Sequence, residues 1–392
     1  MGRKFRLNHL LTVLIIFSVL LSCRRHNDNP GQGKTFYPAE VFVMGADLSY
    51  VNQILEHNGV YRDSGKTEDP YIIFRQYGTN VVRFRLFHNP VWTKEVYTPE
   101  GSKMYNDFED VKEGIRRAKA ADMKVCLDFH YSDTWADPSK QQKPAAWESL
   151  SLTVLRDSLY NYTFSTLQKL GQSGLMPDYV QPGNEINPGF LLPEGARWNN
   201  NEGNMIYLLN GAINAIRDAG NQNIIKPKII IHIAQPENAD SWLNGLAQKG
   251  LTDYDFIGLS YYYIWSTVPL DELSNYISNL RSKYLKDVLI METAYPWTTE
   301  NADNYGNIIN TYKLTDRYPA TEQGQFDYLK SLTGEIIEGG GKGIFYWEPA
   351  WITSDMKDLW GTGSAWDCNT FFDFTGNTLK GINYMTQKYN VK

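Results

Sequence analysis

Eight short apolar runs rich in β-branched residues alternate along this chain with amphipathic patterns of helical period, and this alternation limits the possible folds more than any other feature. The predicted strands are 41–48, 80–87, 124–131, 179–185, 228–235, 256–262, 288–293 and 343–348. The helices predicted to follow them are 51–58, 107–121, 155–170, 204–219, 239–249, 270–283, 322–338 and 379–388. Near-continuous apolar strands alternating with helices indicate a buried parallel sheet, and eight units favour a closed (β/α)₈ barrel, the TIM barrel, over an open doubly wound sheet. No Gly-rich dinucleotide fingerprint follows the first strand, which also argues against the open sheet.

The N-terminus has the pattern of an export signal. Basic residues precede the apolar run 10–21, and small Ser22 stands just before Cys23. The tetrapeptide 20–23, LLSC, resembles a bacterial lipobox, in which the cysteine is lipidated. The alternatives are ordinary cleavage nearby, with Cys23 incidental, and a spanning helix, for which the run is shorter than the roughly 20 residues a bilayer needs. We therefore expect a lipoprotein signal over 1–22, lipidation of Cys23, and an exported protein anchored at a bacterial outer membrane or cell surface.

The segment after Cys23 predicts a flexible tether over 24–36, because 24–34 reads RRHNDNPGQGK and is polar and rich in Gly, Pro and Asn. No Pro/Ser-rich linker divides the rest, so residues 37–392 are expected to form one barrel domain. Cys126 lies in mid-strand within an apolar run, which favours free thiols at Cys126 and Cys368 over a disulfide.

Charge and aromatic content narrow the ligand class. The chain carries 38 basic and 44 acidic residues, so it lacks the basic footprint typical of nucleic-acid binding. Aromatic residues make up 14 %, with 11 Trp and 26 Tyr, and their faces stack on the apolar faces of sugars. We expect a monomer without an organic cofactor that binds a neutral or weakly charged ligand.

Two glutamates stand at the ends of predicted strands, Glu185 in DYVQPGNEIN and Glu292 in DVLIMETAYPW. The carboxyl ends of barrel strands converge on one pocket. Paired carboxyl groups at such a pocket are what glycoside hydrolysis requires, because one protonates the leaving oxygen while the other attacks or activates water. A single strand-end Glu is more often a salt-bridge or surface residue, and the pair alone leaves inverting and retaining chemistry open.

Other strand-end and nearby side chains are candidate substrate-binding residues: Asp47, Arg85, Asp128, His130, Trp135, Asn184, His232, Tyr261, Tyr262 and Trp347. Asn184, next to Glu185, is expected to bind the sugar 2-hydroxyl. Arg85 is expected to lower the pKa of the nucleophilic carboxylate, with a purely structural role as the alternative. No HExxH or clustered Cys/His spacing accompanies the histidines, which favours sugar contacts over a catalytic zinc. The long connections 59–79, 89–106, 132–153 and 298–321 are expected on the same face.

Seven segments in order, MGADLSY, VVRFRLF, LDFHYSDTWADP, QPGNEIN, GLSYY, METAYPW and FYWEPAW, together resemble glycoside hydrolase family 53 of clan A, the endo-β-1,4-galactanases. The resemblance implies retaining hydrolysis of β-1,4-galactan, the side chains of type I arabinogalactan in pectin, with Glu185 on strand four as acid/base and Glu292 on strand seven as nucleophile. Retention requires the two carboxyl groups about 5–5.5 Å apart. The alternatives are a clan A hydrolase of another β-linked polysaccharide, such as mannan or xylan, and a surface glycan-binding protein without turnover.

The resemblance also implies a structural calcium ion in the loop after the seventh strand, because bacterial family members bind calcium in the corresponding loop. Residues 300–307 read ENADNYGN, an alternation of oxygen donors that suits Ca²⁺. The first candidate ligands are Asn301, Asp303, Tyr305 through its carbonyl, and Asn307, followed by Ser364 and Asp367. An Asn/Gly-rich turn without metal is the alternative.

Overall fold

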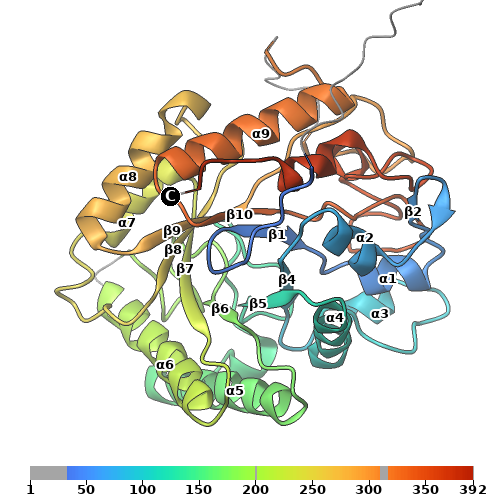
Figure 1. Cartoon of the computed structure of the whole chain (residues 1–392). Helices are drawn as coiled ribbons and strands as arrows, with labels where there is room; N and C mark the ends of the chain where they lie inside the picture. The colour runs from blue at the N-terminus through green and yellow to red at the C-terminus, as the bar shows by residue number, and fades with distance from the viewer. Residues whose placement is uncertain (1–32, 199–200, 310–316, 392) are drawn as a thin grey trace, which may run out of the picture. The chain divides into compact units, whose positions relative to one another are not determined.

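A closed barrel of parallel strands forms the centre of the protein in a computed structural model that describes residues 33–198, 201–309 and 317–391. The strands are β1 (Val43–Asp47), β4 (Val81–Leu86), β5 (Lys124–Phe129), β6 (Tyr179–Pro182), β7 (Lys228–Ala234), β8 (Phe256–Ser260), β9 (Asp287–Glu292) and β10 (Gly343–Tyr346). They follow one another in chain order around the barrel, and β1 closes it by pairing in parallel with both β10 and β4 (Figure 1). The predicted (β/α)₈ fold is confirmed. Residues Thr35–Lys392 form one compact unit.

Helices surround the barrel (Figure 1). The α-helices of the described residues are α1 (Val51–Glu56), α2 (Pro70–Gln76), α3 (Trp92–Glu95), α4 (Phe108–Ala120), α5 (Leu152–Gln172), α6 (Glu202–Asn221), α7 (Pro236–Leu243), α8 (Leu273–Tyr284) and α9 (Glu322–Glu338). Helix α7 is shorter than predicted because the chain leaves the helix at Asn244 and turns at Gly245, whose φ is +81°. The predicted last helix is a 3₁₀ helix, Lys380–Thr386, in a segment where Gly381 and Asn383 disfavour the α-helix.

The segment 59–79, one of the long connections expected on the pocket face, does not directly follow a barrel strand. It follows α1 and contains a small hairpin, β2 (Arg62–Asp63) with β3 (Lys66–Thr67), and then α2. Asp69 caps α2 by accepting a hydrogen bond from the Tyr71 backbone N–H at 2.8 Å, and Pro70 occupies the first helical turn. The chain therefore returns to β4 through α2, and the other three long connections do follow strands β4, β5 and β9.

The interior of the barrel is filled with apolar side chains below the carboxyl ends of the strands. One buried cluster contains Ala39, Val43, Val81, Cys126, Tyr179, Ile230, Leu289, Met291 and Phe345. Gly45 is required in this packing, because a Cβ there would lie 2.2 Å from the Phe345 ring. Cys126 and Cys368 are both buried free thiols. Among the described residues of the barrel strands, the buried charged side chains lie toward the carboxyl ends, which places the chemistry there.

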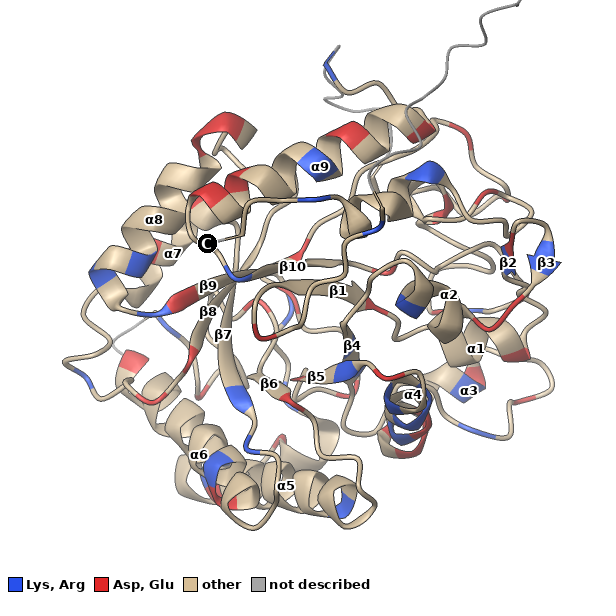
Figure 2. Ribbon diagram, in the orientation of Figure 1, with Lys and Arg blue, Asp and Glu red and all other residues tan. Residues whose placement is uncertain are grey.

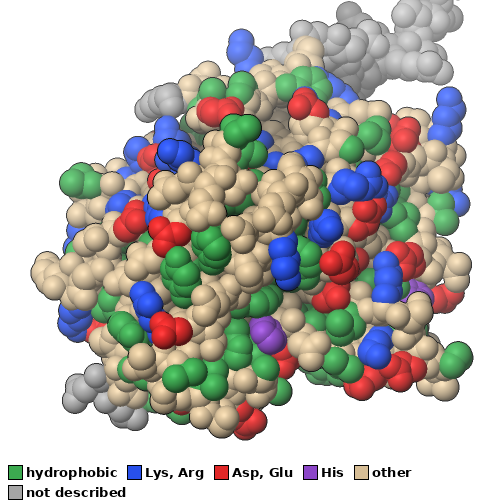
Figure 3. Space-filling view, turned by 90° about the horizontal axis from the view of Figure 1, so that it is seen from below, with side chains coloured by type: hydrophobic (Ala, Val, Ile, Leu, Met, Phe, Trp, Pro, Cys, Tyr) green, Lys and Arg blue, Asp and Glu red, His purple; other side chains and the backbone are tan. Residues whose placement is uncertain are grey.

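Charged side chains of both signs lie along the helices and loops, and α4 carries both (Figure 2). The face seen in Figure 3 also mixes Lys, Arg, Asp and Glu with apolar side chains. Within the described ranges, no helix is long and apolar enough to cross a membrane. The predicted signal at 1–22, Cys23 and most of the predicted tether lie outside the described residues.

Candidate active site

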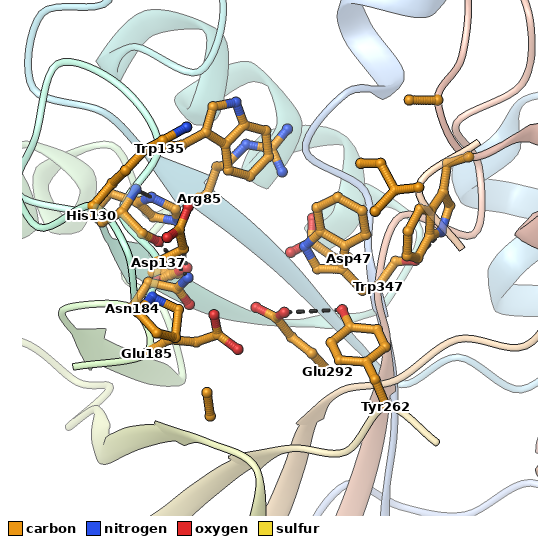
Figure 4. A pocket seen from close by; sticks show the side chains of 18 of the residues that line it. Asp47, Arg85, His130, Trp135, Asp137, Asn184, Glu185, Tyr262, Glu292 and Trp347 are labelled. Atoms are coloured by element: carbon orange, nitrogen blue, oxygen red, sulfur yellow. Dashed lines mark hydrogen bonds and ion pairs between the residues drawn. The ribbon is translucent and has the colours of Figure 1, made fainter. Parts of the chain in front are cut away.

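A pocket of ≈ 710 Å³ opens at the carboxyl ends of the barrel strands, and each of these strands contributes a lining residue at or just beyond its end. The predicted residues that line it are Asp47, Arg85, Asp128, His130, Trp135, Asn184, Glu185, Tyr262, Glu292 and Trp347. Figure 4, which labels all of them but Asp128, shows the labelled side chains around one shared space, with the carboxyl groups of Glu185 and Glu292 facing it from neighbouring sides. The structure thus brings the two predicted catalytic acids together.

Glu292 is the last residue of β9 and is held by two donors. The Arg83 Nη1 atom lies 2.8 Å from its Oε1, and the Tyr262 hydroxyl donates to its Oε2 at 3.0 Å (Figure 4). Burial raises the pKa of Glu292, and the Arg83 charge opposes this rise because it favours the ionised form. Burial and the two glutamate charges also keep Tyr262 protonated by raising its pKa, so Tyr262 remains a donor. Both partners therefore stabilise Glu292 as a carboxylate.

Arg83 links the nucleophile candidate to the rest of the pocket floor. Its Nη1 atom also contacts Asp47 Oδ2 at 3.2 Å, and its Nη2 atom contacts Asp128 Oδ2 at 2.7 Å. The guanidinium side chain is 1 % exposed, so water screens these ion pairs little. Burial alone would raise the pKa of Asp128, but Arg83 and His130 together hold it below its usual value. Arg83 is thus the cation that sets the charge of this side of the site.

Glu185 lies three residues beyond β6 in a left-handed backbone conformation, with φ +45°, which directs its side chain from the strand end into the pocket. Its Oε1 atom lies 2.5 Å from the Ser260 hydroxyl oxygen. Burial, and next the negative charge of Glu292, raise the pKa of Glu185 to about 8. No cation contacts its carboxyl group among the described residues. At neutral pH Glu185 therefore keeps a proton while Glu292, beside Arg83, gives its proton up first.

Asn184 is fixed beside Glu185 by the protein itself. Its Oδ1 atom accepts from Arg83 Nη2 at 2.8 Å and from Gln181 Nε2 at 3.0 Å. Its Nδ2 atom donates to the Ala136 carbonyl at 2.9 Å, which leaves one amide N–H for a ligand. This arrangement is compatible with the predicted contact to a sugar hydroxyl.

Three predictions about individual side chains are corrected by the structure. Arg85 does not contact Glu292: its Nη1 atom donates to Glu348 Oε1 at 2.6 Å, and Arg83 takes the position expected of Arg85. His232 is fully buried behind Asn184 and does not line the pocket. Tyr261 points away from the pocket and donates to the Val268 carbonyl at 3.0 Å. Side chains alternate along a strand, and Ser260 and Tyr262 take the inward positions on either side of Tyr261.

Aromatic and polar loop residues complete the pocket and were missed from the sequence. They are Tyr50, Asp137, Lys140, Asn187, Trp265, Asp358, Trp360 and Trp366. Trp265 and Trp360 are 49 % and 55 % exposed, so each presents aromatic surface on which a sugar could stack. They lie on the loops after β8 and β10. A Trp within a polar connection was the one feature of the sequence that could have indicated these positions.

The predicted calcium ligands gather in one cluster, and the Tyr305 backbone N–H belongs to it because it donates to Asp303 Oδ1 at 2.7 Å. Asp303 Oδ2 and Asp367 Oδ2 both accept from the Thr353 hydroxyl at 2.9 Å. Asn307 Nδ2 bonds to both Asn301 and Asp367, and the Ser364 N–H donates to Asp303 at 2.9 Å. The Tyr305 side chain points away from this cluster: its hydroxyl donates to Asp358 at 2.8 Å, and the ring lines the substrate pocket.

This cluster offers the hard oxygen donors that Ca²⁺ prefers, namely two carboxylates and two side-chain amides. Burial, and to a lesser degree the nearby charge of Asp303, raise the pKa of Asp367. No group of three or more His, Cys, Asp or Glu side chains suited to a metal occurs in the described part of the chain. A bound ion would therefore depend on amide and main-chain oxygens as well as on Asp303 and Asp367.

The pocket holds one carboxyl group that tends to keep its proton and one that tends to lose it, and both lie among indole rings and hydrogen-bond donors. This arrangement is suited to breaking a glycosidic bond. On a (β/α)₈ barrel it defines the class of glycoside hydrolases. Comparison with known proteins then assigns the family. The chain belongs to glycosyl hydrolase family 53, whose family model matches residues 43–385.

Relatives in this family match most of the chain. An arabinogalactan endo-β-1,4-galactanase of Cellvibrio japonicus is 44 % identical over 357 residues, which cover 89 % of this chain and 91 % of that protein. An endo-β-1,4-galactanase of Bacillus subtilis is 36 % identical over 380 residues, with 87 % and 84 % covered. The catalytic domain of a family 53 protein from Ignisphaera aggregans superimposes with a TM-score of 0.80 at 33 % identity, covering 90 % of this chain and 99 % of that domain.

Proposed function

We propose that this enzyme cleaves internal β-1,4-galactosidic bonds of galactan, the side chain of type I arabinogalactan, by a retaining double displacement. The observation that carries the proposal is the unequal environment of the two acids. Burial and the neighbouring charge of Glu292 keep Glu185 protonated, whereas hydrogen bonds from Arg83 and Tyr262 stabilise Glu292 as a carboxylate. The galactanase activity in the names of the relatives supports the substrate.

In the first step, Glu185 donates its proton to the departing glycosidic oxygen while ionised Glu292 attacks the anomeric carbon. The bond from this carbon to the leaving oxygen breaks as the bond to Glu292 forms, which gives a covalent galactosyl-enzyme. Asn184 lies beside Glu185 and has one amide N–H without a protein acceptor among the described residues, so it can donate to the sugar 2-hydroxyl. Arg83 and Tyr262 hold Glu292 in position.

In the second step, Glu185 is ionised and takes a proton from a water molecule that attacks the same carbon. The ester bond to Glu292 breaks, Glu292 returns to its ion pair with Arg83, and Glu185 recovers its proton. Two inversions at one carbon retain the β configuration. The mechanism requires carboxyl groups about 5–5.5 Å apart, which a crystal structure would measure directly.

Product analysis tests the substrate and the reaction together. The enzyme should release short oligosaccharides from linear β-1,4-galactan, seen by mass spectrometry, and proton NMR should show the β-anomer first. Glu185→Gln and Glu292→Gln should abolish release but retain oligosaccharide binding, whereas Glu113→Gln, at an exposed ion pair with Arg116, should remain active. Cleavage of mannan or xylan but not galactan would contradict the assignment of galactan as the substrate. Binding of galactan without any turnover would contradict the assignment of an enzymatic function.

Azide separates the roles of the two glutamates. With an activated galactoside, Glu185→Ala should form its galactosyl-enzyme and pass it to azide, which yields the β-galactosyl azide. Glu292→Ala has space for azide in place of the nucleophile, so direct displacement should yield the α-anomer. Exchange of the two outcomes would show that the roles are reversed.

We also propose that Ca²⁺ binds at the cluster of Asp303 and Asp367, with oxygens of Asn301 and Asn307, and holds the loop after β9 near the pocket. Removal of calcium with EGTA should lower Tm, and added Ca²⁺ should restore it. Asp367→Asn should remove this response, whereas Asp253→Asn at an exposed ion pair should leave it intact. A Tm that is insensitive to calcium in the unaltered enzyme would contradict the site.

We further propose that Cys23 carries the lipid anchor of an exported monomer. The support is the sequence, in which a basic segment, an apolar run and LLSC stand in order. Mass spectrometry of the membrane fraction should find an acylated Cys23 at the N-terminus, and Cys23→Ser should release the enzyme from membranes. Cleavage at another residue would contradict lipidation, and light scattering of the soluble barrel would test the monomer.

A further inference from the structure

Behind Glu185, a hydrogen-bonded chain of buried side chains leads away from the pocket. Ser260 Oγ lies 2.5 Å from Glu185 Oε1 and 3.0 Å from His232 Nε2, and His232 Nδ1 lies 2.9 Å from Asn184 Oδ1. Ser260 and His232 are both fully buried, so the protein must satisfy the hydrogen-bonding groups of this chain from within. The direction of each hydrogen bond can therefore be worked out from donors and acceptors.

The amide of Asn184 gives the fixed end of the chain. Its Oδ1 atom faces two groups that can only donate, Arg83 Nη2 at 2.8 Å and Gln181 Nε2 at 3.0 Å. Its Nδ2 atom faces the carbonyl oxygen of Ala136, which can only accept. Turning the amide would place donor against donor and acceptor against acceptor. Asn184 Oδ1 is therefore an acceptor toward His232.

An acceptor 2.9 Å from His232 Nδ1 requires the ring hydrogen on Nδ1. The backbone N–H of Glu185 also approaches Nδ1, but at 3.4 Å this contact is weaker and does not decide the tautomer. Burial, and next the Arg83 charge, hold the pKa of His232 well below its usual range, so the ring is neutral. A neutral ring with its hydrogen on Nδ1 has a bare Nε2, which must accept the hydroxyl hydrogen of Ser260.

Ser260 has one hydroxyl hydrogen, and it is directed to His232. The short contact between Ser260 Oγ and Glu185 Oε1 then needs a hydrogen from the carboxyl group. The full chain runs from Glu185 to Ser260, from Ser260 to His232, and from His232 to Asn184. Every polar atom is satisfied only when Glu185 is protonated.

Resting on the proposed role of Glu185 as acid/base, we propose that His232 is a positioning residue for the acid: it takes the hydroxyl hydrogen of Ser260 and so leaves the Ser260 oxygen to accept the proton of Glu185. When Glu185 transfers that proton to the glycosidic oxygen, the Ser260 hydroxyl turns to the new carboxylate and His232 Nε2 loses its donor. This loss favours the return of a proton to Glu185 from the attacking water. His232 itself neither gains nor loses a proton.

Other charged groups also face these residues. Glu292 from β9, Asp137 from the loop after β5 and Arg83 from β4 act on Glu185, and the first two raise its pKa while Arg83 lowers it. Arg83, Asp128 and His130 act on His232. None of these contacts the Ser260 hydroxyl, so a change at His232 leaves them in place and isolates the effect of the chain.

The tautomer is measurable in the unaltered enzyme by ¹⁵N NMR of histidine-labelled protein. We expect one ring with hydrogen on Nδ1 and none on Nε2, unchanged between about pH 5 and 8 and absent from His232→Phe. A hydrogen on Nε2 of His232, or titration of the ring in this interval, would overturn the proposal. This measurement needs no substrate and no stable variant.

The pH dependence of galactan cleavage supplies the functional test. In His232→Phe, Ser260 is free to donate to ionised Glu185, so the alkaline limb of kcat/KM should move down by about one pH unit, which corresponds to one hydrogen bond. His57→Phe, which alters a histidine stacked on Tyr97 outside the pocket, should leave the limb in place. An alkaline limb that stays fixed or rises in His232→Phe would overturn the proposal. Lack of galactan cleavage by the unaltered enzyme would instead refute the proposed function, and the NMR result would still decide the tautomer.

Discussion

Substitution of Tyr262 by Phe removes one hydrogen bond from Glu292 with almost no change of shape. The Tyr262 hydroxyl donates to Glu292 Oε2 at 3.0 Å in a position where both side chains are buried. A hydrogen bond to a charged group contributes about 1.5–3 kcal/mol. Since about 1.4 kcal/mol corresponds to a tenfold change in an acid dissociation constant, the pKa of Glu292 should rise by about one to two. Arg83 still contacts Oε1 in the variant, so we expect the lower end of this range.

The acid limb of the kcat/KM profile for galactan measures this change, because protonated Glu292 cannot attack the sugar. The hydrogen bond stabilises the ionised carboxylate, so its loss raises the pKa and moves the acid limb of Tyr262→Phe to higher pH. At pH values below the limb, kcat/KM should fall about tenfold if the limb moves by about one pH unit. The alkaline limb, which follows the coupled acid Glu185, should move much less.

Tyr263→Phe is the matched control. The Tyr263 hydroxyl has no hydrogen-bond partner among the described residues, and its side chain does not line the pocket. Its profile should match that of the unaltered enzyme. An acid limb of Tyr262→Phe that stays in place or moves to lower pH would refute the assignment of Glu292 as the ionised partner, and an equal displacement of the limb in Tyr263→Phe would show a non-specific effect.

Three further changes test other parts of the site. Arg85→Lys keeps the charge but loses the planar guanidinium, which lies 4.1 Å from the Trp135 ring and 4.2 Å from the Tyr50 ring. Steady-state kinetics should therefore show KM raised about tenfold with a smaller change in kcat. The exposed control Arg116→Lys should leave KM unchanged, and an unchanged KM in Arg85→Lys would contradict the expectation. Burial raises the pKa of Glu348 to about 8, so the folded state keeps a proton that the unfolded state releases above about pH 5, and the free energy of unfolding should fall between about pH 5 and 8. Calorimetry should find that the free energy of unfolding of Glu348→Gln falls less steeply with pH than that of the unaltered enzyme, by about 1.4 kcal/mol per pH unit. Equal slopes in the two proteins would show that Glu348 ionises normally. Trp360→Ala should raise KM for long galacto-oligosaccharides more than for short ones, because the exposed ring lies on the loop after β10; equal effects would place it at the centre of the cleft.

The strands and longer helices were predictable because each has a local cause. Helix α9 begins and ends as predicted, since Thr321 caps it by accepting from the Gly324 N–H at 3.0 Å and an amphipathic pattern runs to Glu338. The two acids were predictable for a similar reason, because strand ends in a closed barrel converge. Tyr261 was a mistake that the alternation of side chains from Ser260 onward could have prevented.

Contacts between distant segments were less accessible to sequence reasoning. Arg83 and Arg85 share one side of β4, and the sequence does not show which of them reaches β9. In the barrel, Arg83 pairs in register with Asp47 and Arg85 with Asp128, so the offset between strands decides the partner. The loop residues Trp265 and Trp360 were missed because their positions depend on long connections without a regular period.

The oxygen of the Asn184 amide receives hydrogen bonds from both halves of the site, through Arg83 on the nucleophile side and His232 on the acid side. A substitution that moves this one atom would change the proton affinity of both catalytic acids at once. Variation within the family that adapts the working pH should therefore spare Asn184 and act farther out, for example at Asp137 or Tyr262, each of which acts mainly on one of the two acids. The breadth of the pH range could then evolve separately from its midpoint.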